Sequence, residues 1–482
     1  MHSQLMQPWS TLLALTASLA VSAPQASAET VLGAYVFARH GDRTSKSTPP
    51  TELTSLGYQQ VFNTGSYYHG RYISPSSESR ILGISPDIVK PKQLVASAPE
   101  DEVLQKSTIA FLQALYPPVG NAAKSTLRNG TVVASPMNGY QLIAVEQVST
   151  GGNSENVAWL QGASKCHKAK VSSKEYLSSK SYKELLESTA GFYKTIAPMV
   201  EGTFSEPEVN FKNAYLIWDL LNVARIHNST DSLPANKLPS EEAFSRLQEL
   251  ANLHEFNLAY NASSPIRAVS GSLLAGEVLT GLKEVIDSAG TKGKLKVQFG
   301  AYGIFLSFFG LTKLAETKPD FTGIPDYASS MAFELVTDAP TLPSAPVPDP
   351  SQIKVRFLFC NGTVEPNSPE TEPVAYPLFG QSEILMPWSE FEANMKKIAI
   401  STEQEFCEAC SETPEQCSTT NSSLVSTDRS SGLSKVMAGV VGAFVTLAVI
   451  LALQALAFLV GGFRLVKKAD AKAIKEMEKS RA

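Results

Sequence analysis

A buried strand that runs directly into a histidine flanked by arginines is the feature that most constrains this chain. Residues 31–38 (Val-Leu-Gly-Ala-Tyr-Val-Phe-Ala) are an apolar run of strand length, too short to form the apolar stripe of a helix. They are followed by Arg39-His40-Gly41-Asp42-Arg43-Thr44. Because α/β folds bind ligands at the carboxyl ends of their strands, His40 is expected in a ligand pocket.

These side chains suit the transfer of a phosphoryl group. A histidine nitrogen can attack phosphorus, and the guanidinium groups of Arg39 and Arg43 can bind phosphate oxygens through paired hydrogen bonds. An Arg-His-Gly triplet also occurs by chance, and a structural histidine at the end of a strand is the alternative. We predict His40 as a nucleophile, with Arg39 and Arg43 as phosphate ligands.

Several later segments extend the pattern. Leu53-Thr54-Ser55-Leu56-Gly57 follows the motif, and residues 111–118 are Phe-Leu-Gln-Ala-Leu-Tyr-Pro-Pro. Together with residues 250–257, 265–268 and 306–311, they resemble the histidine acid phosphatases, the branch of the histidine phosphatase superfamily that includes the fungal phytases. The resemblance implies a phosphoglycerate mutase-like fold and hydrolysis of phosphomonoesters through a phosphohistidine. It implies no metal and no cofactor.

The resemblance also implies a third arginine, at a second strand–helix junction, which this chain lacks. The matching stretch, residues 94–104, has Glu102 in that position if no gap is assumed. A carboxylate about 4 Å from a phosphate would turn an attraction of roughly 4 kcal/mol into a similar repulsion at an effective dielectric constant of about 20. The alternative is structural: Ser97 caps a helix, and Glu102 lies in its first turn, where a carboxylate stabilises the helix dipole.

The family's late His-Asp or His-Glu pair, whose acid protonates the leaving alcohol, is missing as well. No histidine follows His254, although the pair should follow the strand at residues 294–297. Gln298 and Tyr302 stand there instead, and a phenol with a pKa near 10 is a poor acid. His254-Glu255 is the right dipeptide, but it lies in a helical segment that matches a non-catalytic part of the family.

The remaining histidines of the mature chain, His69, His167 and His227, are assigned to surface positions. Two functions therefore stay open. One is a phosphomonoesterase with an unidentified acid. The other is an inactive family member that acts as a binding or interaction protein at the cell surface and keeps at most a weak site for a phosphomonoester or another anionic small molecule.

The two ends of the chain predict a membrane protein. Residues 1–28 form a secretory signal that ends in the cleavage site Ala26-Ser27-Ala28. Residues 436–463 carry no charge and exceed the ~20 residues that span a bilayer. The basic tail at 464–482 predicts a type I orientation, with the preceding domain outside the cell or in a lumen. A cleaved lipid-anchor signal is the alternative, and the charged tail argues against it. The cell surface and the vacuolar membrane are both candidate locations.

Glycosylation and disulfide bonds are expected in that compartment. Acceptor sequons occur at Asn129, Asn228, Asn261, Asn361 and Asn421. The five cysteines are Cys166, Cys360, Cys407, Cys410 and Cys417. Disulfide bonding is favoured over zinc or redox roles, and the odd count leaves one thiol free or bonded to another molecule.

The interior of the chain predicts an α/β fold, mainly a parallel sheet flanked by helices, with an inserted helical cap. The core is expected from residues 29–119 and 266–410, with strands at 31–38, 94–97, 294–299 and 353–359. The cap is expected at 120–265, where apolar residues recur at helical spacing, and a Ser/Thr-rich stalk is expected at 411–434. The net charge of −5 provides no basic surface, so a nucleic-acid partner is not expected.

Overall fold

The strand that leads into the motif lies inside a mixed sheet. The computed structural model describes residues 29–148, 166–228, 238–342 and 347–411. Strand β1 (Thr30–Arg39) pairs in parallel with β6 (Leu295–Gly300) and antiparallel with β7 (Ser330–Thr337). The strand order is β10-β8-β7-β1-β6-β2-β5, and β9 pairs with β8. The other strands of this sheet are β2 (Leu94–Pro99), β5 (Val145–Val148), β8 (Ile353–Cys360), β9 (Val374–Ala375) and β10 (Leu385–Pro387).

The expected α/β class is confirmed. Strands β1, β6, β2 and β5 run parallel to one another, and β8 has the same direction as β1 because both are antiparallel to β7. The four predicted strands correspond to β1, β2, β6 and β8. The antiparallel strand β7 between β1 and β8 is not predicted from the sequence.

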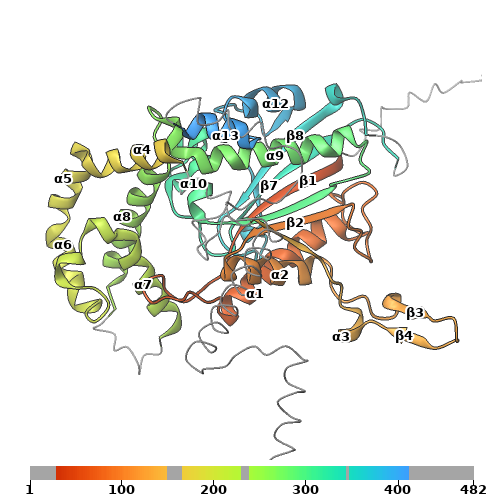
Figure 1. Cartoon of the computed structure of the whole chain (residues 1–482), viewed down its shortest axis with the longest axis horizontal. Helices are drawn as coiled ribbons and strands as arrows, with labels where there is room; N and C mark the ends of the chain where they lie inside the picture. Colours follow the sequence, from red (N-terminus) through yellow and green to blue (C-terminus); the bar gives the residue numbers. More distant parts are fainter. Residues whose placement is uncertain (1–28, 149–165, 229–237, 343–346, 412–482) are drawn as a thin grey trace, which may run out of the picture. The chain divides into compact units, whose positions relative to one another are not determined.

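Helices cover both faces of the sheet (Figure 1). Helices α1 (Ser55–Tyr68) and α2 (Glu102–Leu115) share a hydrophobic core with Val36 and Ala38 of β1. Helices α9 (Val269–Asp287), α10 (Tyr302–Leu311) and α12 (Trp388–Lys396) pack with Tyr35 and Phe37 on the opposite face. Successive strand residues point to opposite faces, so a strand covered on both sides is apolar throughout.

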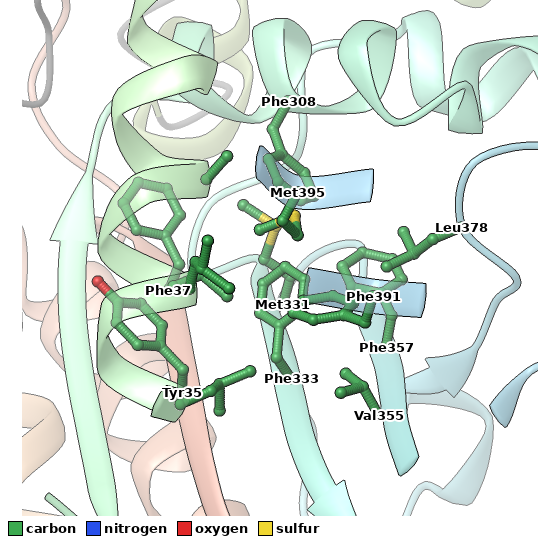
Figure 2. Packing of buried hydrophobic residues seen from close by; sticks show 14 of the residues in the cluster. Tyr35, Phe37, Phe308, Met331, Phe333, Val355, Phe357, Leu378, Phe391 and Met395 are labelled. Carbon is green, nitrogen blue, oxygen red and sulfur yellow. The ribbon is translucent and has the colours of Figure 1, made fainter. Parts of the chain in front are cut away.

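Aromatic rings dominate the second of these cores. Figure 2 shows Phe333 of β7 in the same cluster as Phe308 of α10 and Phe391 of α12. The ring centres lie 5.5 Å apart for Phe308 and Phe333, and 6.2 Å apart for Phe333 and Phe391. This packing fixes α10, whose first residue reaches the motif, against the sheet.

The inserted helices form a smaller unit than expected. Within residues 120–265 they are α4 (His167–Ser178), α5 (Lys180–Ser188), α6 (Ala190–Ile196), α7 (Ala214–His227) and α8 (Glu241–Ala259). They share a hydrophobic core that includes Tyr302 and Leu306 of α10. We refer to this group as the helical cap.

The expected start of the cap at residue 120 is corrected. Residues 120–148 hold a hairpin of β3 (Lys124–Thr126) and β4 (Val132–Ala134), a short helix α3 (Pro136–Gly139), and β5, which extends the main sheet. The β-branched residues of β4 favour a strand, and Gly130, at φ 83°, supplies the left-handed residue that the turn requires.

The start of α2 also differs from the expectation. Asp101 caps this helix, and its Oδ1 accepts a hydrogen bond from the Leu104 amide at 3.1 Å. Ser97 lies inside strand β2 and caps no helix. The described chain also contains α11 (Leu314–Thr317), α13 (Glu403–Cys410) and the single π-helical turn η1 (His69–Ile73).

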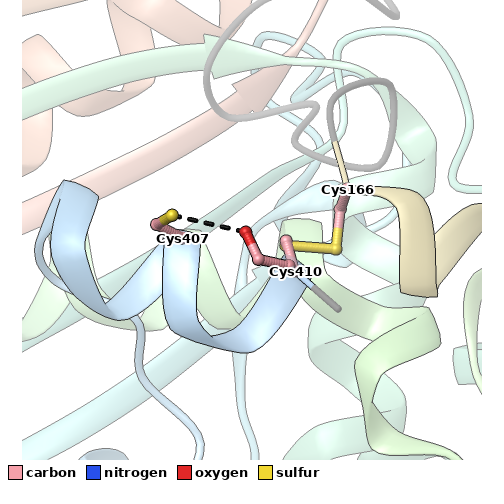
Figure 3. The surroundings of a disulfide bond; sticks show 4 residues. Cys166, Cys407 and Cys410 are labelled. Atoms are coloured by element: carbon pink, nitrogen blue, oxygen red, sulfur yellow. Dashed lines mark hydrogen bonds between the residues drawn. A yellow bond between two sulfur atoms is a disulfide. The ribbon is translucent and has the colours of Figure 1, made fainter. Parts of the chain in front are cut away.

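A disulfide bond joins the cap to the end of the described chain. Cys166, just before α4, is bonded to Cys410 at the end of α13 (Figure 3). Cys407, whose Sγ lies 3.3 Å from the Ser411 hydroxyl, is also disulfide-bonded. Among the described cysteines Cys360 is the free thiol, and burial raises its pKa to about 12. Cys417 lies outside the described residues.

Several expectations concern residues that the structure does not describe. These are the signal at 1–28, the stalk beyond Ser411, the membrane span at 436–463, the basic tail and Asn421. No helix in the described part of the chain has the length and apolar character needed to cross a bilayer. Among the other sequons, Asn129, Asn228 and Asn361 are exposed, and Asn261 is half-buried.

Two glycines bring the motif loop into backbone contact with α1. A Cβ atom on Gly41 would lie 2.1 Å from the Gly57 carbonyl oxygen, and one on Gly57 would lie 2.0 Å from the Asp42 carbonyl oxygen. Thr54 caps α1, because its Oγ1 accepts the Gly57 amide at 3.0 Å and lies 2.5 Å from Asp42 Oδ2. The threonine and glycine of the Leu-Thr-x-x-Gly segment therefore hold the motif loop in place.

We predict that Gly57→Ala lowers the free energy of unfolding by about 1–3 kcal/mol, because the added methyl group meets backbone atoms that cannot move independently. Urea unfolding at pH 7 measures the change. Gly70→Ala is the matched control, since its Cβ would meet nothing within 4 Å, and it should change stability by no more than about 1 kcal/mol. Equal stability of both variants and the parent protein would contradict this interpretation.

A buried carboxylate ties the first helix layer to the sheet. Glu334 of β7 accepts hydrogen bonds from Arg71 Nε at 2.7 Å, Arg356 Nε at 2.8 Å and the Tyr72 hydroxyl at 2.8 Å. Burial tends to raise the pKa of Glu334, but the hydrogen bond from Arg71 and the charges of Arg71 and Arg356 together hold that pKa below its usual range. Glu334 is therefore a buried anion with matched partners.

Glu334→Ala should cost about 3–5 kcal/mol at pH 7, because it leaves the partly buried Arg71 guanidinium and the Tyr72 hydroxyl without their anion, while Arg356 keeps its ion pair with Glu29. A lowered folded-state pKa stabilises the fold above the unfolded value of about 4.3, and this contribution is lost as pH falls through the folded value. Urea unfolding at pH 7 and at pH 3 should show the difference between variant and parent shrinking. Glu284→Ala, which removes a partly exposed ion pair with Lys296, should cost at most about 1 kcal/mol.

Candidate active site

The motif residues are buried where β1 ends. Arg39, His40 and Arg43 are at most 2% exposed. The segment before β7 lies directly against them: the Ser329 carbonyl accepts the Arg39 amide at 2.8 Å, and the His40 carbonyl accepts the Ala328 amide at 2.9 Å. The motif loop is thus held by backbone hydrogen bonds on one side and by α1 on the other.

The surroundings of His40 favour its neutral form. Its Nδ1 lies 2.7 Å from the Gly41 carbonyl oxygen, so we place the ring proton on Nδ1, which leaves the lone pair on Nε2. Burial, and then the positive charges of Arg39 and Arg43, hold the pKa of His40 well below 6.5, against the opposing hydrogen bond to Gly41. The buried environment therefore favours the neutral form of the imidazole.

Arg39 is a buried cation that forms no ion pair within the described part of the chain, although its charge acts on Asp326, whose pKa burial raises and Arg39 lowers. Its Nη1 donates to the Pro325 carbonyl, and its Nε has no hydrogen-bond partner there. The guanidinium carbon lies 4.8 Å from the ring centre of Tyr327 and 5.3 Å from that of Tyr302. Aromatic faces stabilise a cation only in part, so this arrangement favours an anionic ligand beside His40.

Arg43 is already paired with an anion from the helical cap. Asp219 of α7 accepts from its Nη2 at 3.0 Å and from its Nη1 at 3.3 Å. The same carboxylate accepts the Ser45 hydroxyl at 3.0 Å and the Lys46 amide at 2.9 Å. Burial tends to raise the pKa of Asp219, but the charge and hydrogen bonds of Arg43 hold it below its usual range.

Lys46 is a third cation of the site, which the sequence analysis missed. Its Nζ lies 5.5 Å from the ring centre of Tyr302 and 5.6 Å from that of Tyr215. Burial and the charge of Arg43 lower the pKa of Lys46 to about 7, so the amine is protonated in acidic solution. Its position in the motif loop, three residues after Arg43, is the signal that could have identified it.

The residues at the three altered family positions, Glu102, Gln298 and Tyr302, lie in different parts of the structure. Glu102 is 61% exposed at the first residue of α2, and its carboxylate lies 2.5 Å from Lys106 Nζ. Gln298 accepts a hydrogen bond from Tyr35 inside the core below α9. Tyr302, the first residue of α10, contacts Arg39 as described above. Of these three residues, only Tyr302 belongs to the site. Glu102 lies in the first turn of α2, where the structural alternative places it.

A carboxylate lies next to Tyr302. The Tyr302 hydroxyl donates to Glu255 Oε2 at 2.7 Å, and Glu255 Oε1 lies 2.8 Å from His254 Nδ1. His254 and Glu255 come from α8 in the cap. The sequence analysis assigns this segment to a non-catalytic part of the family. The His254-Glu255 dipeptide is the sequence signal that could have identified this carboxylate, although its alignment with the family places it outside the catalytic site.

Helix α7 approaches the motif loop at a second point. His227, assigned to the surface from the sequence, has its Nε2 2.6 Å from Asp42 Oδ2, and its side chain is 34% exposed. The Tyr215 hydroxyl accepts from Arg43 Nη2 at 3.0 Å. Tyr215, Asp219 and His227 thus attach one cap helix to the motif loop.

Solved structures of other proteins share the fold of this chain. Phytase structures are similar to this chain in fold: that of Klebsiella sp. ASR1 has a TM-score of 0.54 at 12% identity and covers 80% of this chain and 97% of its own. The apo phytase of Hafnia alvei has a TM-score of 0.52 at 12% identity, with coverage of 81% and 100%. The phytase of Citrobacter braakii has 0.50 at 15% identity, with coverage of 80% and 100%.

Sequence comparison leads to the same family. No curated protein sequence matches the chain. The profile of the histidine phosphatase superfamily (branch 2) matches residues 47–359, a range that starts just after the motif and covers well over half of the chain. The resemblance found from the motifs is confirmed: the chain belongs to branch 2 of the histidine phosphatase superfamily.

Proposed function

We propose that this protein hydrolyses small phosphomonoesters, with His40 as the nucleophile. The observation that carries the proposal is the buried guanidinium of Arg39, which forms no ion pair in the described chain and stands beside an imidazole whose neutral form is favoured. A phosphate group bound there would supply the missing anion. Family membership supports the same chemistry.

The reaction would proceed in two displacements at phosphorus. His40 Nε2 attacks the phosphoryl group, the N–P bond forms, and the ester P–O bond breaks as the alcohol leaves. Water then attacks phosphorus, the P–N bond breaks, and phosphate leaves as the imidazole is restored. Arg39 and Lys46 stabilise the charge on the phosphoryl oxygens in both steps.

Substrate entry requires a movement of the cap. His40 has no exposed surface, and the ring of Tyr327 lies 5.7 Å from its ring centre. Tyr215 and Tyr302 stack with their ring centres 4.9 Å apart beside the same cations. Because α7 contributes Tyr215 and Asp219, its displacement would open the pocket and release Arg43 for phosphate.

The cellular setting of this activity is also a proposal. The secretory signal at 1–28 and the apolar segment at 436–463 support a type I membrane protein whose catalytic domain faces the outside of the cell or a lumen. The sequons and the Cys166–Cys410 disulfide bond fit such a compartment.

A catalytic His40 makes a direct prediction. In assays with p-nitrophenyl phosphate between pH 3 and 7, His40→Ala should lower kcat by about 1,000-fold or more, because no nucleophile remains to form the covalent intermediate. Rapid alkaline quenching should trap phosphohistidine on the parent protein alone. Equal rates for the parent protein and the variant would exclude the proposed enzyme.

A second function is favoured by one specific contact. The pair between Arg43 and Asp219 satisfies a phosphate-binding guanidinium from within the protein. A carboxylate held by a guanidinium, a hydroxyl and a backbone amide resembles a bound phosphate in its hydrogen bonds. A family member that binds a partner and no longer turns over substrate would be expected to retain this pair permanently.

Asp219→Asn separates the two functions. If Asp219 competes with substrate, the neutral amide should tighten inorganic phosphate binding by roughly tenfold, as measured by isothermal titration calorimetry at pH 5. Glu241→Gln, which alters an exposed ion pair with Arg225 of α7, should leave phosphate affinity unchanged. Absence of phosphate binding by both the parent protein and Asp219→Asn would favour the non-catalytic function.

A further inference from the structure

The proposed hydrolysis needs an acid that the usual position does not provide. Ala301 and Tyr302 stand where α10 begins, and the first carboxylate after them in the sequence is Glu316. Tyr302 is a poor acid by itself, because burial and the negative charge of Glu255 raise its pKa well above 10. An alkoxide leaving group would therefore depart without a proton unless another residue contributes one.

The cap brings a carboxylate to this position. Glu255 is the hydrogen-bond partner of the Tyr302 hydroxyl at 2.7 Å, and the Tyr302 ring lies against the Arg39 and Lys46 cations that border His40. The Glu255 side chain is 15% exposed, so bulk water has limited access to it. The carboxylate thus lies one hydroxyl group away from the phosphate site.

His254 fixes the orientation of that carboxylate. Its Nδ1 lies 2.8 Å from Glu255 Oε1, while its Nε2 is buried and has no partner within the described chain. We therefore place the ring proton on Nδ1, where it donates to Glu255. With His254 holding one carboxylate oxygen, the other is directed at Tyr302.

We infer that Glu255 protonates the leaving alcohol through the hydroxyl group of Tyr302, in place of the late acid that the α10 N-terminus lacks. This inference rests on the proposed phosphomonoesterase function. Tyr302 is the catalytic residue that touches the substrate, Glu255 is the proton source behind it, and His254 is a positioning residue.

The protons balance over the two steps. As the ester P–O bond breaks, the Tyr302 hydroxyl gives its proton to the alkoxide oxygen and receives the proton of the Glu255 carboxylic acid. In the second step the attacking water gives a proton to Tyr302, which passes its own to the Glu255 carboxylate. No phenolate accumulates, so the raised pKa of Tyr302 does not block the transfer.

Four titratable groups interact with Glu255. They are His254 on its own helix, Tyr302 of α10, Lys46 of the motif loop and Tyr176 of α4. Lys46 is the cation among these groups, and its charge attracts the Glu255 carboxylate.

The test compares substrates with good and poor leaving groups. A proton donor matters for an alkyl phosphate such as glycerol 2-phosphate, and much less for p-nitrophenyl phosphate, whose leaving group is a stable anion. We expect Glu255→Gln and Tyr302→Phe each to lower kcat/KM by about 100-fold or more on glycerol 2-phosphate. On p-nitrophenyl phosphate we expect kcat/KM to fall by less than about tenfold, with phosphohistidine still trapped. The pH profile of Glu255→Gln on glycerol 2-phosphate should flatten, since an amide does not titrate.

Glu249→Gln is the matched control, because it makes the same change on an exposed side chain of the same helix, and it should leave both substrates unaffected. If Glu255→Gln fails to fold, Tyr302→Phe alone gives the same comparison of substrates. Equal losses on both substrates would indicate a structural role and overturn the inference. A parent protein that is inactive on p-nitrophenyl phosphate would instead overturn the proposed function.

Discussion

The ion pair between Arg43 and Asp219 is the contact on which the arrangement of the site depends. It is 1% exposed on both sides and joins the motif loop to a helix 176 positions later in the chain. A buried pair of this kind is weak as a source of stability, but the loss of either partner leaves a buried charge. The helical cap is thus attached to the motif loop through the guanidinium that the proposed function assigns to phosphate, so that function would link substrate binding to the position of the cap.

The two arginines of the motif have different electrostatic environments although they are only four residues apart. Arg43 has its counter-anion in the protein, whereas Arg39 is surrounded by aromatic rings and a carbonyl group. This asymmetry places the unmet positive charge directly beside His40. Burial, and then the charges of Arg39, Arg43 and Lys46, explain why the neutral form of the His40 imidazole is favoured.

The groups that complete the site come from the motif loop and from the cap, and not from the second strand–helix junction used by the family. Glu102 points into solvent, where it pairs with Lys106, while Lys46 provides positive charge and Glu255 a carboxylate close to Tyr302. The absence of a family motif in the sequence therefore does not show that the chemical group is absent from the pocket. A lysine or a glutamate from another element can reach the same space.

The sequence by itself determined the elements whose signals are local. The apolar run before Arg39, the threonine that caps α1 and the glycine that lets its backbone approach Asp42 all follow from residues close together in the chain. The same local rules identified β2, β6 and β8 and the helical character of the cap. Only the tertiary structure decided that Asp219 and His227 meet the motif loop, that Glu255 meets Tyr302, and that β7 separates β1 from β8. Periodicity shows which face of a helix is buried, but the partner of a polar side chain depends on how helices far apart in sequence pack together.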